Sequence, residues 1–256
     1  MIPDVLHLGP IPIHLFGMML AIAFMTSGHV LGREFDRKGY DGDLASSGVL
    51  WCAAGSLIGA RLWLVFEDWP GFVRDPLGTL FTGSGFVFYG GLVGGALAMT
   101  LFFRRHGIPW WRGADAVAPA LVIGQAIGRI GCQLSGDGDW GTVTTMPWGM
   151  TYPYAVVGWP YPPGVHVHPT PIYESVAYFA VFALLWRWRR TPHQPDGTIF
   201  CWYLVLGSGA RFLIEFLRIN PVVLGNLTAA QVASVVLVII GGTRLLAQSR
   251  WRAAEA

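Results

Sequence analysis

The most unusual feature of this sequence is an arginine near the end of a long apolar run. Arg129 lies in the run 114–130, just before the glycine-rich stretch GCQLSGDGDWG, which holds Asp137 and Asp139. A cation in a lipid core is costly unless an anion or water pairs with it. A guanidinium group suits phosphate because its fork binds two oxygen atoms together and keeps its charge when water is removed. The pattern therefore indicates a site for a phosphate-bearing ligand.

Two further arginines occupy comparable places in other apolar runs. Arg61 and Arg211, like Arg129, each lie about five residues before the end of a predicted membrane span. At about 1.5 Å per residue, the three guanidinium groups are then roughly 7–9 Å below the same membrane surface. We expect an anion site at this depth, and a phospholipid headgroup is the obvious anion. Other polar residues predicted to reach this depth are His14, Tyr89, Tyr173, Glu174 and Glu215.

Some of these residues also have a purely structural interpretation. Arg211 and Glu215 are separated by one helical turn and can form an ion pair along one helix. Arg61 can extend its charged end to the lipid headgroups without taking part in any reaction. Arg129 is harder to explain in this way, because glycines on both sides of it leave its side chain exposed to a cavity. Arg129 is therefore at the centre of the predicted site.

The elements that must position these residues are predicted to be membrane-spanning helices. The chain of 256 residues is 53% hydrophobic and only 12% charged, whereas about a quarter of the residues of a soluble domain are charged. We expect an all-α membrane protein with a single integral membrane domain over residues 1–256. No basic residue precedes the first apolar stretch, so we do not expect it to be a cleaved signal peptide. Seven stretches have the roughly 20 apolar residues that a transmembrane helix needs: 11–31, 45–66, 85–103, 114–134, 171–188, 198–217 and 228–246.

The basic residues predict the orientation of these seven spans. Four groups of three basic residues fall on one side of the layout, and the positive-inside rule places that side in the cytoplasm. The N-terminus is then outside and the C-terminus in the cytoplasm. The segment 135–170, between the fourth and fifth spans, faces outward and is expected to form a small extracytoplasmic cap. The basic residues are Arg33, Arg37 and Lys38; Arg104, Arg105 and Arg112; Arg187, Arg189 and Arg190; and Arg244, Arg250 and Arg252.

Small residues recur in the spans at a spacing that favours close helix packing. Gly55 and Gly59 are four residues apart, and so are Gly90 and Gly94. Such pairs lie on one face of a helix and let a second helix approach closely. Because glycine is common in membrane spans, this spacing is weak evidence when it stands alone.

Other kinds of chemistry leave no recognisable pattern in the sequence. Cys52, Cys132 and Cys201 are odd in number and are not spaced as a disulfide framework or a metal site. His166 and His168 do not make a zinc site without other ligands. There is no phosphate-binding glycine loop, nucleophile elbow or nucleic-acid-binding motif. We therefore expect no metal, no cofactor and no nucleic-acid partner.

The position of the cap bears on the kind of reaction. A site that only held a lipid would not need an outward segment, yet the segment 135–170 begins directly at the arginine motif. A second substrate can enter beneath it from the exterior. A lipid and an exterior acceptor together indicate a transferase, in which the arginines stabilise a phosphate leaving group.

Six motifs follow one another along the chain: GPIPIHLFGMM (9–19), GARLWLVFEDWPGFVRDPL (59–77), FYGGLVGG (88–95), GRIGC (128–132), HPTPIYE (168–174) and GSGARFLIEFLR (207–218). In this series the chain resembles the prolipoprotein diacylglyceryl transferase family over nearly its whole length. A collinear series of matching motifs is far more specific than any one of them. The resemblance implies a bacterial inner-membrane enzyme that transfers the diacylglyceryl group of phosphatidylglycerol to the lipobox cysteine thiol of a prolipoprotein at the outer leaflet, releasing glycerol phosphate.

The resemblance also implies roles for particular residues. Arg129 matches the signature arginine that contacts the phosphatidylglycerol headgroup, and Arg211 matches a second essential arginine. Tyr89, where the family usually has a histidine, completes the catalytic set. Together with the residues at the common depth in the spans, the expected substrate-binding set is Arg129, Arg61, Gly90, Gly91, Asp137, His168, Glu174, Glu215 and Arg218.

The chain departs from the family pattern at several of these positions. The usual signature continues G-R-x-G-N-F-x-N-x-E, whereas Cys132, Gln133, Ser135 and Asp137 stand at the corresponding places, and Phe16 stands where a tyrosine is common. We expect a divergent member with the same reaction.

The acceptor of the thiol proton is left open by these departures. A phenol with an ordinary pKa of about 10 is a poor base at neutral pH, so Tyr89 competes for this role with Asp137, Asp139, Glu174 and His168. Two other functions also stay open. One is a family member that only binds lipid or transfers it to another acceptor, and the other is a small multi-span transporter, which the absence of inverted-repeat symmetry disfavours.

Overall fold

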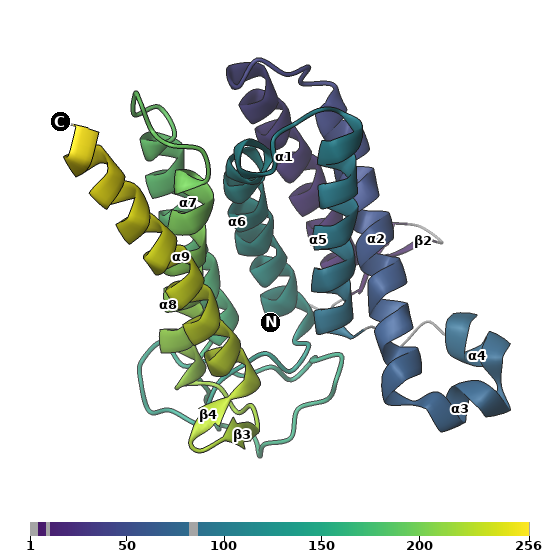
Figure 1. Ribbon diagram of the computed structural model, residues 1–256. Coiled ribbons are helices and arrows are strands. Elements are labelled where there is room, and N and C mark those ends of the chain that lie inside the picture. The colour runs from purple at the N-terminus through teal and green to yellow at the C-terminus, as the bar shows by residue number, and fades with distance from the viewer. Residues whose placement is uncertain (1–4, 9–10, 82–86, 256) are drawn as a thin grey trace. The chain divides into compact units, whose positions relative to one another are not determined.

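The computed structural model describes residues 5–8, 11–81 and 87–255 and divides into two compact units (Figure 1). The first unit consists of residues 1–30 and 114–256, and the second of residues 31–113. Both units consist mainly of long helices. Residues 85 and 86, at the start of the third predicted span, lie outside the described part of the chain. The expectation of one integral membrane domain stays a prediction.

Long helices occupy all seven of the predicted spans. In the described residues, five of these helices, α1, α2, α6, α8 and α9, are long and apolar enough to cross a membrane. The chain is therefore a helical membrane protein, and the crossing of α5 and α7 stays a prediction. The helices are α1 (Leu15–Arg37), α2 (Leu44–Glu67), α5 (Phe88–Arg105), α6 (Trp110–Ser135), α7 (Thr170–Trp188), α8 (Thr198–Glu215) and α9 (Ala229–Glu255).

The first helix begins later than its predicted span and ends later as well. Residues 11–14 form strand β2 (Ile11–His14), which pairs antiparallel with β1 (Val5–Leu8). Pro12 explains the difference, because proline has no backbone N–H and disfavours helix in the residue before it. At its other end, α1 continues past the apolar stretch to Arg37, through four charged residues and Phe35, so the length of the apolar stretch alone underestimates the length of the helix.

The helices of the first unit are held in register by small apolar residues and by buried polar contacts. Helix α8 packs against both α7 and α9. The Ser175 hydroxyl of α7 donates to the Ala126 carbonyl of α6 at 2.9 Å. Asp115 of α6 accepts 2.8 Å hydrogen bonds from the backbone N–H groups of Gly197 and Phe200, and so satisfies donors at the start of α8. A cluster of buried residues fills the space between these helices: Ala118, Val122, Ala126, Tyr178, Val181, Leu185 and Ile199.

The segment 136–169, which connects α6 to α7, is folded. It packs on a small core of Trp140, Tyr152 and Val167, in which the first two rings are stacked with centroids 5.2 Å apart. Gly141 joins the segment to the residues that follow α8 through a bridge with Arg218. A Cβ atom at Gly141 would lie 2.3 Å from the Leu217 carbonyl oxygen, so only glycine fits there. The extracytoplasmic location of this segment stays a prediction.

A tight hairpin leads from α8 into α9. It consists of β3 (Val222–Leu224) and β4 (Leu227–Thr228), and the turn between them contains Gly225 at a φ of 58°. Glycine adopts this left-handed conformation without steric cost. The hairpin brings Thr228 and the first turn of α9 back to the end of α8.

In the second unit, α2 and α5 pack through their glycines. A Cβ atom at Gly59 would lie 2.3 Å from the Gly90 carbonyl oxygen, and one at Gly94 would lie 2.2 Å from that of Gly55. The predicted small-residue packing is therefore confirmed for both pairs, and it joins α2 to α5. Two short helices, α3 (Trp69–Arg74) and α4 (Pro76–Phe81), follow α2.

Candidate active site

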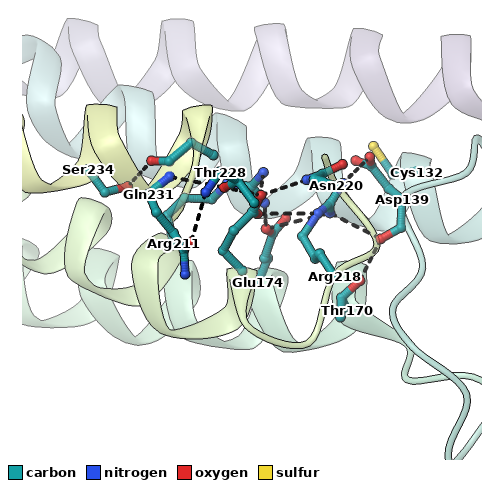
Figure 2. Close-up of polar contacts among 12 residues, drawn as sticks. Cys132, Asp139, Thr170, Glu174, Arg211, Arg218, Asn220, Thr228, Gln231 and Ser234 are labelled. Carbon is teal, nitrogen blue, oxygen red and sulfur yellow. Dashed lines mark hydrogen bonds and ion pairs between the residues drawn. The ribbon is translucent and has the colours of Figure 1, made fainter. Parts of the chain in front are cut away.

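Three arginines and three carboxylates form a continuous ionic network in the first unit. We call it the arginine–carboxylate network. Figure 2 shows it extending from Arg211 through Glu174 and Arg218 to Asp139. The side chains come from the C-terminal part of α6, the start of α7, the end of α8 and the connecting segment. The members are Arg129, Arg211, Arg218, Asp139, Glu174 and Glu215.

Glu174 is the central carboxylate of this network. Its Oε2 atom lies 2.5 Å from Nε of Arg129, while its Oε1 atom contacts Nη1 of Arg211 and lies 3.7 Å from Nη1 of Arg218. The Glu174 side chain is 0% exposed, and a carboxylate buried to this degree must be paired. Arg129 and Arg211 therefore contact the same carboxylate, and their common role in binding an anionic lipid stays a prediction.

Glu215 contacts two of the three arginines, Arg211 and Arg218. Its Oε2 atom lies 2.9 Å from Nη2 of Arg211 and 3.5 Å from Nε of Arg218. The ion pair expected from the i, i+4 spacing of Arg211 and Glu215 is therefore present. It is part of the network rather than an isolated pair, and Glu215 is 2% exposed.

Glu215 is itself positioned by polar residues that sequence reasoning missed. Its Oε1 atom accepts hydrogen bonds from Nδ2 of Asn220 at 2.7 Å and from Oγ1 of Thr228 at 2.8 Å. Gln231 in turn accepts from the Thr228 backbone N–H at 3.0 Å. Thr228 and Gln231 are buried, so these bonds fix the Glu215 side chain from the β3–β4 hairpin and α9.

Asp139 bridges two of the arginines. One carboxylate oxygen contacts Nη1 of Arg129 and the other contacts Nη2 of Arg218. Its backbone carbonyl accepts from Nη1 of Arg218 at 3.0 Å and from Oγ1 of Thr170 at 2.5 Å. Burial by itself would raise the pKa of Asp139, but the guanidinium groups of Arg129 and Arg218 outweigh it and hold this pKa below its ordinary value.

Of the two aspartates in the connecting segment, Asp139 contacts the arginines, and the binding role predicted for Asp137 stays a prediction. Asp137 accepts a hydrogen bond from the Asp139 backbone N–H at 3.3 Å. Cys132, Asp137 and Asp139 bring potential metal-ligand atoms within 4.8 Å of one another. Both oxygens of Asp139 already contact guanidinium groups, and the Cys132 Sγ lies 3.9 Å from Nη1 of Arg129. A cation there would compete with fixed positive charges, so we assign no metal centre to this group.

His168 lies beside the network, next to a pocket of about 580 Å³. Its Nδ1 atom is 3.2 Å from the Tyr173 hydroxyl, which also accepts a 2.8 Å hydrogen bond from Nε1 of Trp148. Tyr173 precedes Glu174 in the chain, so the pocket adjoins the turn of α7 that carries the central carboxylate. The pocket is lined by Pro147, Trp148, Gly149, Met150, Pro169, Ile172 and Tyr173.

The remaining predicted site residues belong to the second unit and are described within it. Arg61 donates from Nη1 to the Thr79 carbonyl at 3.1 Å. Tyr89, at the start of α5, is 40% exposed. Gly90 is in close contact with α2, and Gly91 follows it on the same helix. A role for these residues in the reaction stays a prediction.

The network is well suited to bind an anion. The side chains of Arg129 and Arg211 are 24% and 19% exposed, whereas those of Glu174 and Glu215 are fully buried. Buried carboxylates thus hold partly exposed guanidinium groups in fixed positions. Donors fixed in advance stabilise negative charge that develops during a reaction, because they need no rearrangement at that moment.

Comparison with known proteins identifies the family of this chain. Residues 3–247 match the family model described as prolipoprotein diacylglyceryl transferase. The chain is 32% identical over 245 residues to a protein of Synechocystis, covering 93% of this chain and 86% of the relative. It is 33% identical to one of Bacillus cereus (91% and 87% covered) and 34% identical to one of Leptospira interrogans (81% and 72% covered). These relatives are named phosphatidylglycerol–prolipoprotein diacylglyceryl transferase. The chain therefore belongs to the prolipoprotein diacylglyceryl transferase family.

Proposed function

We propose that this protein transfers the diacylglyceryl group of phosphatidylglycerol to the lipobox cysteine thiol of a prolipoprotein and releases glycerol phosphate. The observation that carries the proposal is the pair of partly exposed guanidinium groups, Arg129 and Arg211, held on the buried carboxylate of Glu174. Family membership and the names of the relatives supply the two substrates. Both substrates are compatible with a membrane protein whose site adjoins a folded connecting segment.

Diacylglyceryl transfer requires the leaving phosphate group to be stabilised. The acceptor sulfur forms a bond to the glyceryl carbon while the bond from that carbon to the phosphate oxygen breaks. The thiol loses its proton, and the departing glycerol phosphate gains negative charge on its oxygens. We assign Arg129 and Arg211 to that charge, with Arg218 as a third donor to the phosphate, since a guanidinium binds phosphate oxygens through two parallel N–H groups.

The thiol proton needs an acceptor outside the tightest ion pairs. Protonating Glu174 would break its contacts with three arginines, and protonating Asp139 would break its bridge between Arg129 and Arg218. Both are therefore poor bases in this arrangement. The acceptors that we retain from the predicted set are Tyr89, Asp137 and His168.

We also propose the seven-span layout with the N-terminus outside, the C-terminus in the cytoplasm and the cap on the outer face of the bacterial inner membrane. The end of α6, the start of α7 and the end of α8 all meet the connecting segment 136–169, which supports a site on the side of the cap. Cysteine-accessibility labelling of intact cells tests this layout. Labelling of residues 104–112 from outside would contradict it.

Transfer is tested with the purified full-length protein in vesicles that contain phosphatidylglycerol. A lipobox peptide is added, and mass spectrometry measures the mass gain of one diacylglyceryl group on its cysteine. The matched controls are a peptide with serine in place of that cysteine and vesicles of phosphatidylethanolamine alone. Binding of phosphatidylglycerol without any mass gain on the cysteine peptide would point to a lipid-binding protein and refute the proposed transfer.

A further inference from the structure

Asp139 occupies the place on the arginines that a phosphate group would take. Its two carboxylate oxygens contact two different guanidinium groups, those of Arg129 and Arg218. A phosphate diester offers the same arrangement, with two acceptor oxygens on one centre and a single negative charge. The carboxylate thus imitates the ligand that these arginines are suited to bind.

The charges of the network favour a phosphate that replaces one of the carboxylates over a phosphate that binds in addition to all three. Three guanidinium groups face three carboxylates, so the network is neutral. A phosphate diester added to the complete set would leave one uncompensated negative charge in a largely buried site, which is unfavourable. If one carboxylate leaves as the phosphate arrives, the balance of charge is unchanged.

Asp139 is the carboxylate that can leave. Glu174 and Glu215 have side chains with 0% exposure, and both lie on helices. Asp139 lies in the connecting segment, and its side chain is 28% exposed. It can therefore reach water without disturbing a helix, whereas a displaced glutamate would remain buried and unpaired.

The backbone of Asp139 can stay in place during the exchange. Its carbonyl oxygen is held by Oγ1 of Thr170 and by Nη1 of Arg218. Rotation of the side chain about its Cα–Cβ bond is enough to withdraw both oxygens from the arginines. Arg218 keeps its bond to the Asp139 carbonyl, so its guanidinium group remains oriented for an incoming phosphate.

We infer that Asp139 is a displaceable stand-in for the lipid phosphate: it closes the arginine site in the free protein, moves aside when phosphatidylglycerol binds, and returns as glycerol phosphate leaves. The inference rests on the proposed function for the identity of the lipid, but the exchange itself is a property of the arginine site. It gives Asp139 a role in substrate affinity and product release that differs from that of the glutamates.

The exchange is tested by binding of inorganic phosphate to the purified full-length protein in detergent, measured by isothermal titration calorimetry without any acceptor peptide. Asp139→Asn removes the competing charge, so its affinity for phosphate should exceed that of the wild type by about tenfold or more, the worth of one charge-assisted hydrogen bond. Asp139→Ala should behave in the same way. The matched control is Asp43→Asn, which removes the same charge from an exposed side chain that makes no capping bond at the start of α2, and its affinity should equal that of the wild type.

An affinity of Asp139→Asn and Asp139→Ala equal to or below the wild-type value would overturn the inference, because Asp139 would then support the arginines rather than compete for them. If these variants do not fold, a measurement on the wild type tests the same exchange. With ¹³C-labelled aspartate carboxylates, the infrared difference spectrum on adding phosphate should show one ion-paired carboxylate becoming hydrated. An unchanged aspartate signal would likewise overturn the inference. Tighter phosphate binding in Asp139→Asn together with absent lipid transfer in the wild type would uphold the exchange and reject the proposed function. Normal lipid transfer in the wild type, together with an unchanged phosphate affinity in Asp139→Asn, would uphold the proposed function and reject the exchange.

Discussion

Nε of Arg129 lies 2.5 Å from Oε2 of Glu174, and this ion pair joins the C-terminal part of α6 to the first turns of α7. The same carboxylate contacts Arg211 of α8 through its other oxygen. A single buried acid therefore fixes the relative positions of two arginines that are 82 residues apart in the numbering of the chain. This relationship is the reason to expect the guanidinium groups to act together on one anion.

Replacing Arg129 by lysine should remove most of the activity although the charge is kept. Lysine is a compact point charge that cannot contact Glu174, Asp139 and a phosphate with a planar fork. We expect transfer to fall by at least about tenfold, the cost of one charge-assisted hydrogen bond. The initial rate of peptide lipidation measures this, with the exposed Arg104→Lys of α5 as the control. If Arg129→Lys turns over normally while Arg129→Ala is inactive, charge alone suffices and the fork has no special role.

Glu174→Gln should lower the stability of the folded protein. The substitution keeps the shape of the side chain but leaves three arginines with one carboxylate fewer. Removing one partner from a buried ionic group typically costs about 3–5 kcal/mol. The thermal unfolding midpoint in detergent measures the loss, and Glu67→Gln, on an exposed side chain of α2, serves as the control. Equal midpoints for the two variants would mean that the Glu174 ion pairs contribute nothing net to folding.

Thr228→Val tests whether the residues behind Glu215 matter to the site. Valine has a similar shape but can neither donate to Oε1 of Glu215 nor accept from the Gln231 backbone N–H, and the loss of these bonds should lower the free energy of unfolding by about 1–3 kcal/mol. Thr243→Val on α9 is the matched control, since Thr243 is exposed and bonds only to carbonyls of its own helix. Unfolding by denaturant should separate the two variants, and coincident curves would show that Glu215 does not need this donor.

The helices could be predicted well from the sequence because one physical requirement determines the structure of a membrane span. A backbone that crosses lipid must satisfy its own hydrogen bonds, so long apolar stretches become helices. The predicted ranges of α2, α6 and α8 accordingly agree with the structure to within a few residues. The start of α1 was misplaced because the apolar pattern does not distinguish a helix from a short β-strand, and Pro12, which disfavours helix in the residue before it, was not taken into account.

The site was predictable only in part. Arg129, Glu174, Arg211 and Glu215 lie on helices whose ends face the same segment, so their depth in the spans indicated that they would meet. Asp139 could not be chosen over Asp137, because the path of the connecting segment decides which of the two reaches the arginines. It depends on long-range contacts such as the pairing of Gly141 with Arg218, which no local pattern encodes.

The lowered pKa of Asp139 predicts how the network responds to acid. Its pKa in the folded protein is below the ordinary value of 3.8, so its contribution to stability is complete above that value and is lost as the pH falls through the lower folded-state pKa. The difference in unfolding free energy between wild type and Asp139→Asn should therefore be constant above about pH 5 and shrink below about pH 4. Chemical denaturation across this range measures it. A difference that already changes near neutral pH would contradict a lowered pKa.

The last prediction concerns Tyr89, which stands where the family usually has a histidine. A phenol with an ordinary pKa of about 10 is a poor base at neutral pH, and arginines that balance a lipid phosphate cannot also stabilise a phenolate at full strength. We therefore expect Tyr89 to orient the lipid by donating its hydroxyl to a phosphate or glyceryl oxygen. Tyr89→Phe should then slow transfer by about 10- to 150-fold, the worth of roughly 1.5–3 kcal/mol for a hydrogen bond to a charged group.

The rate is measured against pH for wild type, Tyr89→Phe and the control Tyr154→Phe, whose ring is 59% exposed in the connecting segment. Parallel pH profiles offset in rate are the expected result, whereas loss of one ionisation in Tyr89→Phe alone would show that Tyr89 takes the thiol proton.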